Sequence, residues 1–388
     1  MRILYYSWDE SNGEDCRDAM VRLGHQVDTI KIQMEGYDLT PEMEKAFEEK
    51  LTDGYDLVFS FDFFPNISEF CQKHNIPYIS WVFDCPHYTI DSHHANNPVN
   101  RIFLFDKKLY TQMLGKGINT FRYSPLAVNA ERLSKLCQDL DAETGGSIVY
   151  QHDVCFLGSL YDNDYNFYDQ VKFLPPYLKG YVDAVIAAQE RVFGADFFTE
   201  DAIFSDDHVR QLREYIKFED TGKYEINYDN VIRDILRKKV TVNERHHILE
   251  QMGKHFETVL YTAPGARDIP GVCNMGVADY YTKMPKVFRR SKINLNITLR
   301  SILSGVPLRV MDVLAAGGFL ITNYQEEIAE YFVDGQDLVM AYTPEDMVEK
   351  TAYYLEHDEE RKAIALKGQK KVMDNFAYTK LLPQILTF

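Results

Sequence analysis

Short apolar runs alternate with helical patterns over residues 1–125. The runs predict strands at Ile3–Tyr6, Val27–Ile30, Leu57–Phe61, Pro77–Phe83 and Ile102–Phe105, and the segments between them predict helices at about Glu14–Leu23, Pro41–Leu51, Ile67–His74 and Lys107–Leu114. Nearly continuous apolar strands separated by helices are typical of a parallel sheet covered on both faces. We therefore predict a Rossmann-like domain over residues 1–140.

The same alternation restarts near Asp153. It predicts strands at Val154–Leu157, Thr258–Tyr261, Ile293–Ile297, Phe319–Thr322 and Asp337–Met340, and helices at Val310–Ala316, Glu326–Phe332, Glu345–Leu355 and about Glu359–Asn375. A second Rossmann-like domain is predicted over residues 150–358. The stretch Gln138–His152, which contains a glycine pair, is the expected connection. The last helix, within about residues 359–388, is expected to pack back on the first domain.

Residues 161–253 interrupt the second domain. This segment is rich in charge and tyrosine, and its apolar residues recur with a helical rather than a strand-like period. We predict that it is a helical insertion. The expected fold class is α/β, with two Rossmann-like domains facing a cleft where the carboxyl ends of both sheets meet.

Composition and charge narrow the class of protein. The chain has 388 residues, 45% hydrophobic and 26% charged, which suits a globular protein of two domains. Its net charge of −17 argues against a nucleic-acid-binding protein, because phosphate backbones require a basic face. No signal peptide or apolar run of about 18 residues is recognisable, and the six cysteines are scattered. We expect a cytoplasmic protein with reduced thiols and no transmembrane segment.

Basic residues dominate the window between Asp279 and Asp312, where no acidic residue occurs. They are Lys283, Lys286, Arg289, Arg290, Lys292, Arg300 and Arg309. The first five are also compatible with a solvated helix face. Arg300 and Arg309 instead flank a predicted junction of strand, loop and helix, where a parallel sheet places its ligands.

This junction predicts an anion site. The loop Thr298–Gly305 brings a glycine that allows close backbone approach, and Pro307 suits the first turn of a helix. Free N–H groups, the helix dipole and nearby arginines together suit a diphosphate. Asp312 follows about one turn into the helix, where it could accept hydrogen bonds from a ribose or simply complement the helix N-terminus.

These residues lie within longer stretches that resemble a known family. From Lys292 to about Asn375 the sequence is similar to the C-terminal half of family-4-like glycosyltransferases, in the spore-maturation (CgeB-like) branch. The matching stretches are SKINLN (291–296), GVPLRVMD (305–312), AAGGFLITN (315–323) and YYL (353–355) followed by Glu360-Arg361. The accompanying half resembles the family at IPYISWVFDCPH (76–87), FLFD (103–106) and DVCFLGSLY (153–161). The resemblance covers nearly the whole chain except the insertion.

The resemblance implies a glycosyltransferase-B fold, with the nucleotide-sugar donor in the C-terminal domain and the acceptor in the N-terminal one. It implies a hexosyltransferase-type enzyme with a uridine diphosphate (UDP) sugar as donor, while the acceptor (protein, glycan or small molecule) stays open. No cofactor and no metal are expected, because basic side chains and a helix N-terminus stabilise the leaving diphosphate. A nucleotide-sugar epimerase of the same fold and a non-catalytic nucleotide-sugar-binding protein are the alternatives.

Donor contacts are assigned residue by residue. Ribose binding carries over to Asp312, but Ser304 stands where retaining relatives have the first of two glutamates, so the stereochemistry stays open. The turn after the first strand of the second domain is expected to approach the donor phosphates. The predicted donor-binding residues are Gly158, Ser159, Arg300, Ser304, Gly305, Val306, Pro307, Arg309 and Asp312.

Asp84 and His87 follow a predicted strand of the first domain. An Asp–His pair at that position could act as a general base toward an acceptor hydroxyl, and a structural role with Pro86 turning the chain is equally compatible. We predict Asp84 and His87 as catalytic residues.

We assign no chemical role to the other sequence motifs. Asp162-Asn163-Asp164 imitates a metal-binding D-x-D but is expected to be a solvated loop, and His246-His247 has no partner at metal-ligand spacing. The run Arg237-Lys238-Lys239 is expected on a solvated helix face. The dinucleotide fingerprint G-x-G-x-x-G is missing from the sequence.

Overall fold

The computed structural model describes residues 1–34, 36–162, 166–218 and 226–387. The chain divides into two compact units. The first unit comprises residues 1–129 and 375–387, with 226–227, and the second comprises 130–218 and 228–374, apart from the positions just excluded.

The first unit is built on a six-stranded sheet whose strands all run parallel. The strands are β1 (Arg2–Tyr6), β2 (Gln26–Ile30), β3 (Leu57–Phe61), β4 (Tyr78–Val82), β5 (Asn100–Leu104) and β6 (Phe121–Tyr123). Their order is β2-β1-β3-β4-β5-β6, so the strand order reverses between β1 and β3. The predicted strands of this domain are all present, and β6 is an addition.

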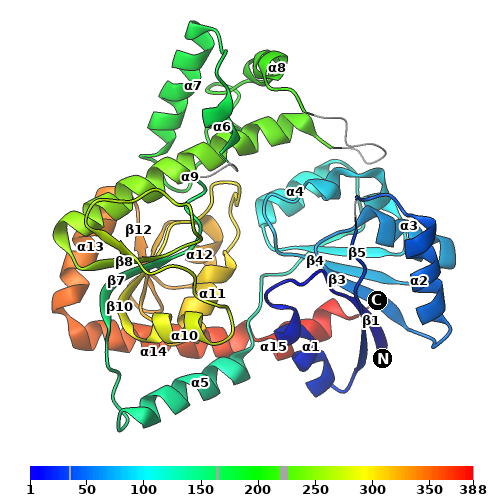
Figure 1. The fold of residues 1–388 in the computed structure, drawn as a ribbon, viewed down its shortest axis with the longest axis horizontal. Helices are drawn as coiled ribbons and strands as arrows, with labels where there is room; N and C mark the ends of the chain where they lie inside the picture. Colours follow the sequence, from blue (N-terminus) through cyan, green and yellow to red (C-terminus); the bar gives the residue numbers. More distant parts are fainter. Residues whose placement is uncertain (35, 163–165, 219–225, 388) are drawn as a thin grey trace. The chain divides into compact units, whose positions relative to one another are not determined.

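Helices cover both faces of this sheet (Figure 1). They are α1 (Gly13–Arg22), α2 (Pro41–Leu51), α3 (Pro65–His74), α4 (Lys107–Gly115) and α15 (Tyr378–Ile385), with short 3-10 turns at Tyr88–Asp91 and His93–Asn96. Alternate strand residues point to opposite faces. Leu4 and Val58 therefore pack with α2 and α3 on one face, whereas Tyr5 and Phe59 pack with α1 and α15 on the other.

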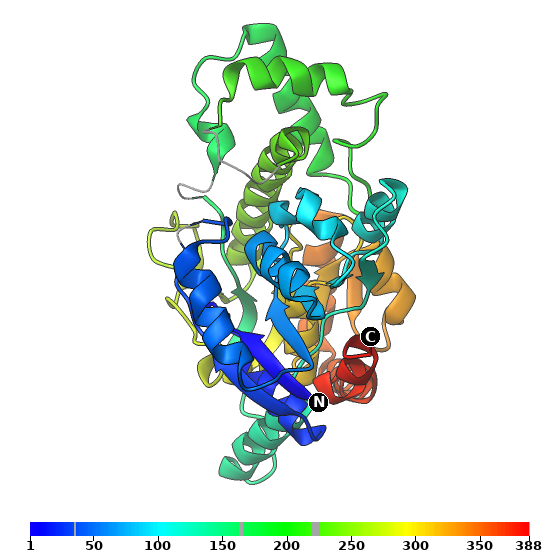
Figure 2. The same cartoon turned by 90° about the vertical axis from the view of Figure 1, so that its right-hand side faces the viewer.

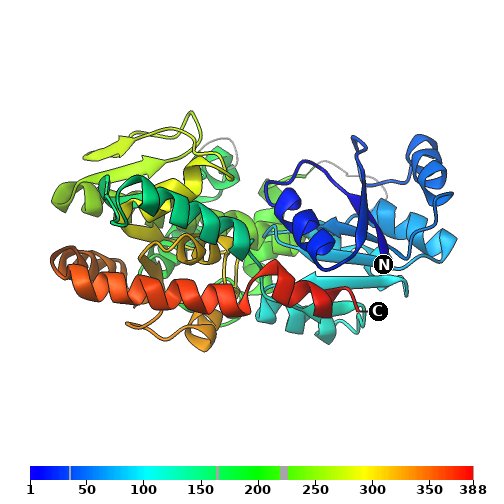
Figure 3. The same ribbon diagram turned by 90° about the horizontal axis from the view of Figure 1, so that it is seen from below.

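Helix α15 belongs to the first unit although it is the last helix in the chain. Figure 3 shows it beside α1. The ring of Tyr378 contacts Trp81 edge-on with ring centres 5.9 Å apart, and its hydroxyl accepts a hydrogen bond from Asn12 Nδ2 at 3.2 Å. Leu382 and Ile385 are buried in the same core. Residues far apart in sequence thus close one hydrophobic face.

The second unit also contains a parallel six-stranded sheet. Its strands are β7 (His152–Leu157), β8 (Thr258–Tyr261), β9 (Val272–Asn274), β10 (Ser291–Asn296), β11 (Leu320–Asn323) and β12 (Val339–Ala341). The order is β12-β11-β10-β7-β8-β9, which is the Rossmann order with its reversal between β7 and β10. The predicted α/β class with two Rossmann-like domains is therefore confirmed, and β9 was not predicted.

The helices of the second unit are α5 (Ala130–Glu143), α6 (Phe167–Gln170), α7 (Pro176–Gln189), α8 (Asp206–Tyr215), α9 (Tyr228–His255), α10 (Lys283–Arg289), α11 (Leu308–Ala315), α12 (Glu326–Tyr331), α13 (Pro344–Glu356) and α14 (Asp358–Asn375). The segment predicted as a helical insertion contains α6 to α9. Figure 2 shows α7 and α8 at one end of α9. Helix α9 itself packs on β8 and β9, so it is the crossover helix that joins β7 to β8.

The predicted connection Gln138–His152 is wrong in its first part. Helix α5 continues to Glu143, and its apolar stripe of Leu133, Cys137 and Leu140 is buried within the second unit. The non-helical connection before β7 is therefore confined to residues 144–151.

Candidate functional site

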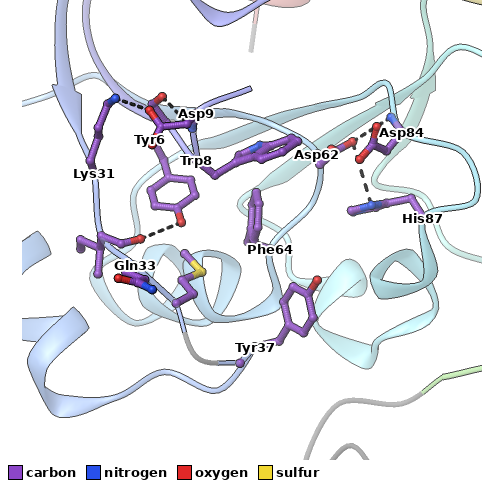
Figure 4. Close-up of a pocket in the computed structure, with 14 residues that line it drawn as sticks. Tyr6, Trp8, Asp9, Lys31, Gln33, Tyr37, Asp62, Phe64, Asp84 and His87 are labelled. Atoms are coloured by element: carbon purple, nitrogen blue, oxygen red, sulfur yellow. Dashed lines mark hydrogen bonds and ion pairs between the residues drawn. The ribbon is translucent and has the colours of Figure 1, made fainter. Parts of the chain in front are cut away.

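A pocket of about 810 Å³ lies at the carboxyl ends of β1, β2, β3 and β4 in the first unit (Figure 4). Its lining comes from the loop after each strand, and includes Trp8, Lys31, Asp62 and Asp84. The pocket spans the reversal of strand order between β1 and β3, which is where open α/β sheets bind ligands. The predicted catalytic residues Asp84 and His87 both line this pocket.

Two carboxyl groups meet in this pocket. Asp62 follows β3 and Asp84 follows the neighbouring strand β4, and a side-chain hydrogen bond links them. Asp62 is only 2% exposed, whereas Asp84 is open to solvent. Burial raises the pKa of Asp62 to about 7, and desolvation together with the Asp62 carboxyl raises the pKa of Asp84 to about 6. Two adjacent carboxyls that resist ionising together share a proton near neutral pH.

Backbone groups and a histidine fix the buried carboxyl. Asp62 Oδ1 accepts hydrogen bonds from the N–H groups of Phe83 and Asp84, both at 3.1 Å, and lies 4.0 Å from His87 Nδ1. His87 Nε2 lies 3.0 Å from both the backbone nitrogen and the carbonyl oxygen of Phe63 and 2.7 Å from Thr89 Oγ1, and these groups fix the position of the ring. Burial lowers the pKa of His87, so the imidazole is neutral at physiological pH.

A second buried carboxylate, Glu10, shapes the loop after β1. It accepts hydrogen bonds from the Tyr5 hydroxyl at 2.6 Å, the Ser7 hydroxyl at 3.2 Å and the Trp8 N–H at 2.9 Å. A Cβ atom at Gly13 would lie too close to this side chain, so a larger residue there would displace the Glu10 carboxylate. Glu10 thereby fixes the position from which Trp8 enters the pocket.

In the second unit, the carboxyl ends of β7 and β10 carry the predicted donor contacts. Gly158 continues the hydrogen bonding between β7 and β8, since its N–H donates to the Tyr261 carbonyl at 3.0 Å. Ser159 Oγ accepts from the N–H of Tyr161 at 3.1 Å and closes the turn. Because β7 and β10 are adjacent and parallel, this turn and the loop after β10 emerge at the same edge of the sheet.

Arg245 of α9 joins these two strand ends, although no pattern in the sequence predicts this contact. Its Nε and Nη2 donate to the Ile297 carbonyl after β10 at 3.1 and 2.6 Å, and its Nη1 donates to the Ser159 carbonyl after β7. The side chain is 7% exposed, and no ion pair found within the described residues includes it. Burial lowers its pKa, and the nearby Arg309 adds to this. This buried cation, which also lies over the rings of Phe156 and Tyr161, thus marks the reversal of strand order.

The loop after β10 leads into α11 much as predicted. The N-cap Pro307 offers no side-chain hydrogen bond to the first turn of α11, and Gly305, Val306 and Pro307 are buried. Arg309 Nη1 lies 3.4 Å from Asp312 Oδ2. The Asp312 side chain is 5% exposed.

A buried glutamate lies against Ser304. The Ser304 hydroxyl donates to Glu327 Oε1 at 2.7 Å, and the Glu327 N–H donates back to the Ser304 carbonyl at 3.1 Å. Glu327, at the start of α12, is 1% exposed. A carboxyl group is therefore present at this point of the fold although position 304 carries a serine.

Arg300 is engaged in a different way from that predicted. Its Nε donates to both carboxylate oxygens of Glu244 at 3.0 Å, and Glu244 is buried on α9. The Arg300 N–H also donates to Thr241 Oγ1 at 2.9 Å. This arrangement ties the loop after β10 to α9. A diphosphate contact by Arg300 stays a prediction that would require this buried pair to open.

Acidic residues outside the basic window, four of them distant in sequence and one at its end, pair with five of its cations. The pairs are Arg289 with Asp141, Arg290 with Glu143, Lys292 with Asp153, Arg300 with Glu244 and Arg309 with Asp312. The first two join the C-terminal end of α10 to α5. Most of the window therefore contributes ion pairs between elements, and it does not form one continuous basic surface.

Two expectations about polar motifs are wrong. Asp162 is not solvated: its side chain is 2% exposed and pairs with His246 Nε2 at 2.9 Å. Asn163 and Asp164 lie outside the described residues. Arg237 is also buried, with ion pairs to Asp196 at 2.5 Å and Asp234 at 2.9 Å, so it holds the insertion to α9 instead of facing solvent.

Possible metal ligands and membrane-spanning helices can be assessed for the described residues. A grouping able to hold a metal ion, Glu44, Glu48 and His74, lies on α2 and α3, and none of the three lines the pocket of Figure 4. No helix in the described part of the chain combines the length and the apolar character that crossing a membrane requires.

Comparison with known proteins identifies the class of fold. Residues 237–387 match the family described as "Glycosyl transferase-like". No curated protein sequence matches the chain.

Solved structures agree over nearly the full length. A glycosyltransferase from Rickettsia africae has 10% sequence identity and a TM-score of 0.51, with 99% of this chain and 96% of that chain covered. A sucrose-phosphate synthase from Thermosynechococcus elongatus has 11% identity and a TM-score of 0.51, with 99% and 97% covered. HepE from Anabaena, solved with UDP-glucose, has 11% identity and a TM-score of 0.52, with 100% and 98% covered. The chain has a glycosyltransferase-B type fold.

Proposed function

We propose that the protein transfers a hexosyl group from a nucleoside diphosphate sugar, with uridine as the base, to an acceptor hydroxyl. The observation that carries this proposal is the buried guanidinium of Arg245 at the reversal point of a glycosyltransferase-B type unit. Two backbone carbonyls and the rings of Phe156 and Tyr161 hold this guanidinium in place, and a diphosphate would add the opposite charge. The structures of HepE with UDP and with UDP-glucose support the choice of donor.

The predicted donor contacts fit around this cation. The diphosphate would lie between Arg245, Arg309 and the uncapped first turn of α11, where N–H groups and the helix dipole favour negative charge. Asp312 would accept the ribose hydroxyls, as the resemblance to the spore-maturation branch implies. These fixed positive groups stabilise the leaving diphosphate, so we propose that no metal is needed. We further propose that the protein acts in the cytoplasm.

Direct binding of nucleotides tests the donor site. UDP and uridine are titrated into wild type and Arg245→Lys by calorimetry. Lysine keeps the charge but loses the forked geometry, so we expect about tenfold weaker binding of UDP and unchanged binding of uridine. Equal losses for both ligands would contradict the diphosphate role and indicate a general disturbance of the unit.

Asp312→Ala tests the ribose contact in the same assay. We expect it to weaken both UDP and uridine by about tenfold, since a charged hydrogen bond to a hydroxyl is lost. Lys286→Ala is the matched control, because Lys286 lies in the same basic window but is exposed on α10. If Asp312→Ala leaves binding unchanged, the donor-site assignment is wrong.

Turnover of a panel of nucleotide sugars tests the reaction itself. We expect release of UDP from a uridine-linked donor, and we expect this rate to be unchanged when a chelator such as EDTA is added. A rate that disappears with EDTA and returns with Mn²⁺ or Mg²⁺ would overturn the metal-independent proposal. Conversion of the donor alone into a second nucleotide sugar would indicate an epimerase instead.

A further inference from the structure

Resting on the proposed function, we propose that Tyr161, Asp162 and His246 form a clamp that positions Arg245 for the diphosphate of the donor. Tyr161 and Asp162 lie in the turn after β7, and His246 follows Arg245 directly on α9. All three are positioning residues, because they act on the donor through Arg245.

Tyr161 has a backbone conformation that tyrosine rarely adopts. Its φ is +56°, in the left-handed region, where a residue with a Cβ atom is strained. Such a conformation persists only where the surrounding contacts impose it, and these conformations concentrate at functional sites. The Tyr161 N–H donates to Ser159 Oγ at 3.1 Å, which fixes the turn before Tyr161. A second anchor follows at the next residue.

Asp162 anchors the turn to two other elements. One of its carboxylate oxygens, Oδ2, lies 2.9 Å from His246 Nε2 on α9 and accepts a hydrogen bond from the Arg267 N–H, also at 2.9 Å. Arg267 belongs to the segment that follows β8. The Asp162 side chain is 2% exposed, so water competes little for these bonds. The end of the turn is thus tied both to α9 and to the segment after β8.

This turn places the ring of Tyr161 against the guanidinium of Arg245. The ring centre is 5.1 Å from Arg245 Cζ, and the ring centre of Phe156 on β7 is 5.3 Å from the same atom. Cation–π contacts of this kind stabilise a desolvated arginine. Lys238, about two helical turns earlier on α9, has its Nζ 5.5 Å from the Tyr161 ring centre. The Tyr161 ring therefore lies against two cations of one helix.

Arg245 is consequently held by two kinds of contact. The carbonyls of Ser159 and Ile297 accept from its N–H groups, and the ring of Tyr161 restricts the guanidinium plane. A guanidinium whose fork is already oriented loses less side-chain freedom when a diphosphate binds. Without the anchor at Asp162, the turn can relax from its strained conformation and withdraw the ring. The clamp should therefore raise the affinity for the diphosphate without touching it.

Calorimetric titrations of UDP and uridine test the clamp. Asp162→Ala removes the shared acceptor oxygen, so we expect about tenfold weaker binding of UDP and unchanged binding of uridine, which has no diphosphate. Loss of the negative charge alone would instead strengthen the binding of an anion, so the two effects have opposite signs. Wild-type or tighter UDP binding by Asp162→Ala, or an equal loss for uridine, would overturn the proposal.

The conservative substitution at the same position is the rescue. Asp162→Asn keeps an acceptor oxygen of the same reach, so UDP affinity should return to within about twofold of wild type. Asp53→Asn controls for the loss of one negative charge, because Asp53 is an exposed acid of the first unit. An Asp162→Asn variant as weak as Asp162→Ala would contradict the role of the acceptor oxygen.

The Asp162–His246 pair should act as one unit. We expect His246→Ala to weaken UDP binding by the same factor as Asp162→Ala, and the double variant to lose no more than either single variant. His247→Ala is the matched control, because His247 is the next residue of α9 and is exposed. Additive losses in the double variant would show that His246 does not act through Asp162.

Tyr161→Gly separates positioning from support of the fold. Glycine adopts a φ of +56° without strain, but it removes the ring from Arg245. We expect UDP affinity to fall about fivefold with uridine binding unchanged, since one cation–π contact is lost. The thermal midpoint of the second unit should change little, because relief of the strain offsets the lost contact. A lowered midpoint together with weaker uridine binding would show that Tyr161 only supports the fold.

Hydrogen exchange tests the clamp without any nucleotide. The N–H groups of Tyr161 and Arg267 are bonded within it, so both should exchange at least about tenfold faster in Asp162→Ala and at the wild-type rate in Asp162→Asn. Unchanged exchange in Asp162→Ala would overturn the clamp even if UDP binds. Failure of the wild type to bind any nucleotide would instead refute the proposed function, and the exchange rates would still decide whether Asp162 holds this turn.

Discussion

The buried carboxyl of Asp62 has a consequence for stability. Its pKa in the folded protein is about 7, well above the ordinary aspartate value, so the folded state keeps a proton that the unfolded chain releases. The folded state therefore binds more protons between about pH 4 and pH 7, and the free energy of unfolding decreases as the pH rises through this window.

Asp62→Asn should weaken this dependence. The backbone of Asp62 has φ +59°, a conformation that asparagine also tolerates. We expect the variant to gain about 2 kcal/mol relative to wild type on going from pH 5 to pH 8. Urea unfolding at the two pH values measures this difference. Asp53→Asn should keep the wild-type dependence, and a parallel dependence in Asp62→Asn would contradict the raised pKa.

Single site residues can be predicted from sequence where they directly follow a predicted strand. Asp84 and His87 are predicted as site residues because they follow a strand, and both line the pocket. Asp62 follows β3 in the same way and could have been found by the same rule. Arg245 gave no such signal, because only the tertiary structure brings α9 to the ends of β7 and β10. Glu244, the partner of Arg300, is 56 positions away in the sequence, so no local pattern predicts the pair.

At the scale of elements, glycines show how closely backbones approach. A Cβ atom on Gly253, in the last turn of α9, would lie 2.8 Å from the Pro270 carbonyl oxygen and from the Gly271 carbonyl carbon. We expect Gly253→Ala to push α9 away from the 270–271 turn and to cost about 2 kcal/mol of stability. A lowered thermal midpoint of the second unit measures this.

Gly180 provides the matched control. It lies inside α7, and a Cβ atom there would meet nothing within 4 Å. Gly180→Ala should therefore stabilise the helix by about 0.5–1 kcal/mol, since alanine loses less backbone entropy on folding. If both substitutions shift the thermal midpoint in the same direction, the close approach of α9 to the 270–271 turn is not the reason why position 253 requires glycine.

Elements with a strong hydrophobic period were predicted well. Leu57–Phe61, Pro41–Leu51 and Thr258–Tyr261 have the predicted bounds. The strands β6 and β9 were missed because three residues are too short for a period to show. Helix α5 is not predicted for another reason: its apolar stripe is regular, but the glycine pair that follows it favours a linker.

The local excess of positive charge could not be interpreted from sequence alone. Charges interact through space, so acidic residues of α5 and α9 neutralise a window that contains no acid of its own. The loop and helix that the window contains were predicted correctly. The number of cations left free for a ligand was not, because it depends on how the elements pack.

At the scale of the whole molecule, α15 connects the end of the chain to the stability of the first unit. Ending the chain after Asn375 would remove Tyr378, Leu382 and Ile385 from the core under β1 and β3. Each large apolar side chain lost from a core costs about 2–5 kcal/mol, so the first unit should unfold. Hydrogen exchange of the β1 and β3 amides measures this.

The control for this truncation is Lys380→Ala. Lys380 lies on α15 but is exposed, so the substitution should leave the protection of β1 and β3 unchanged. The truncation also removes the pairing of Val128 with Ala377 that accompanies α15. Retained protection of β1 in the truncated chain would show that the sheet is stable without its last helix.

The late position of α15 also matters during biosynthesis. A ribosome makes β1 and α1 early, yet the hydrophobic face that α1 and α15 cover together is completed only after residues 378–385 have been added. Domains usually fold in order as they emerge, but here part of one apolar face of the first sheet stays uncovered until α15 has been made. The nascent protein should therefore depend on chaperones from the first strand to the last helix.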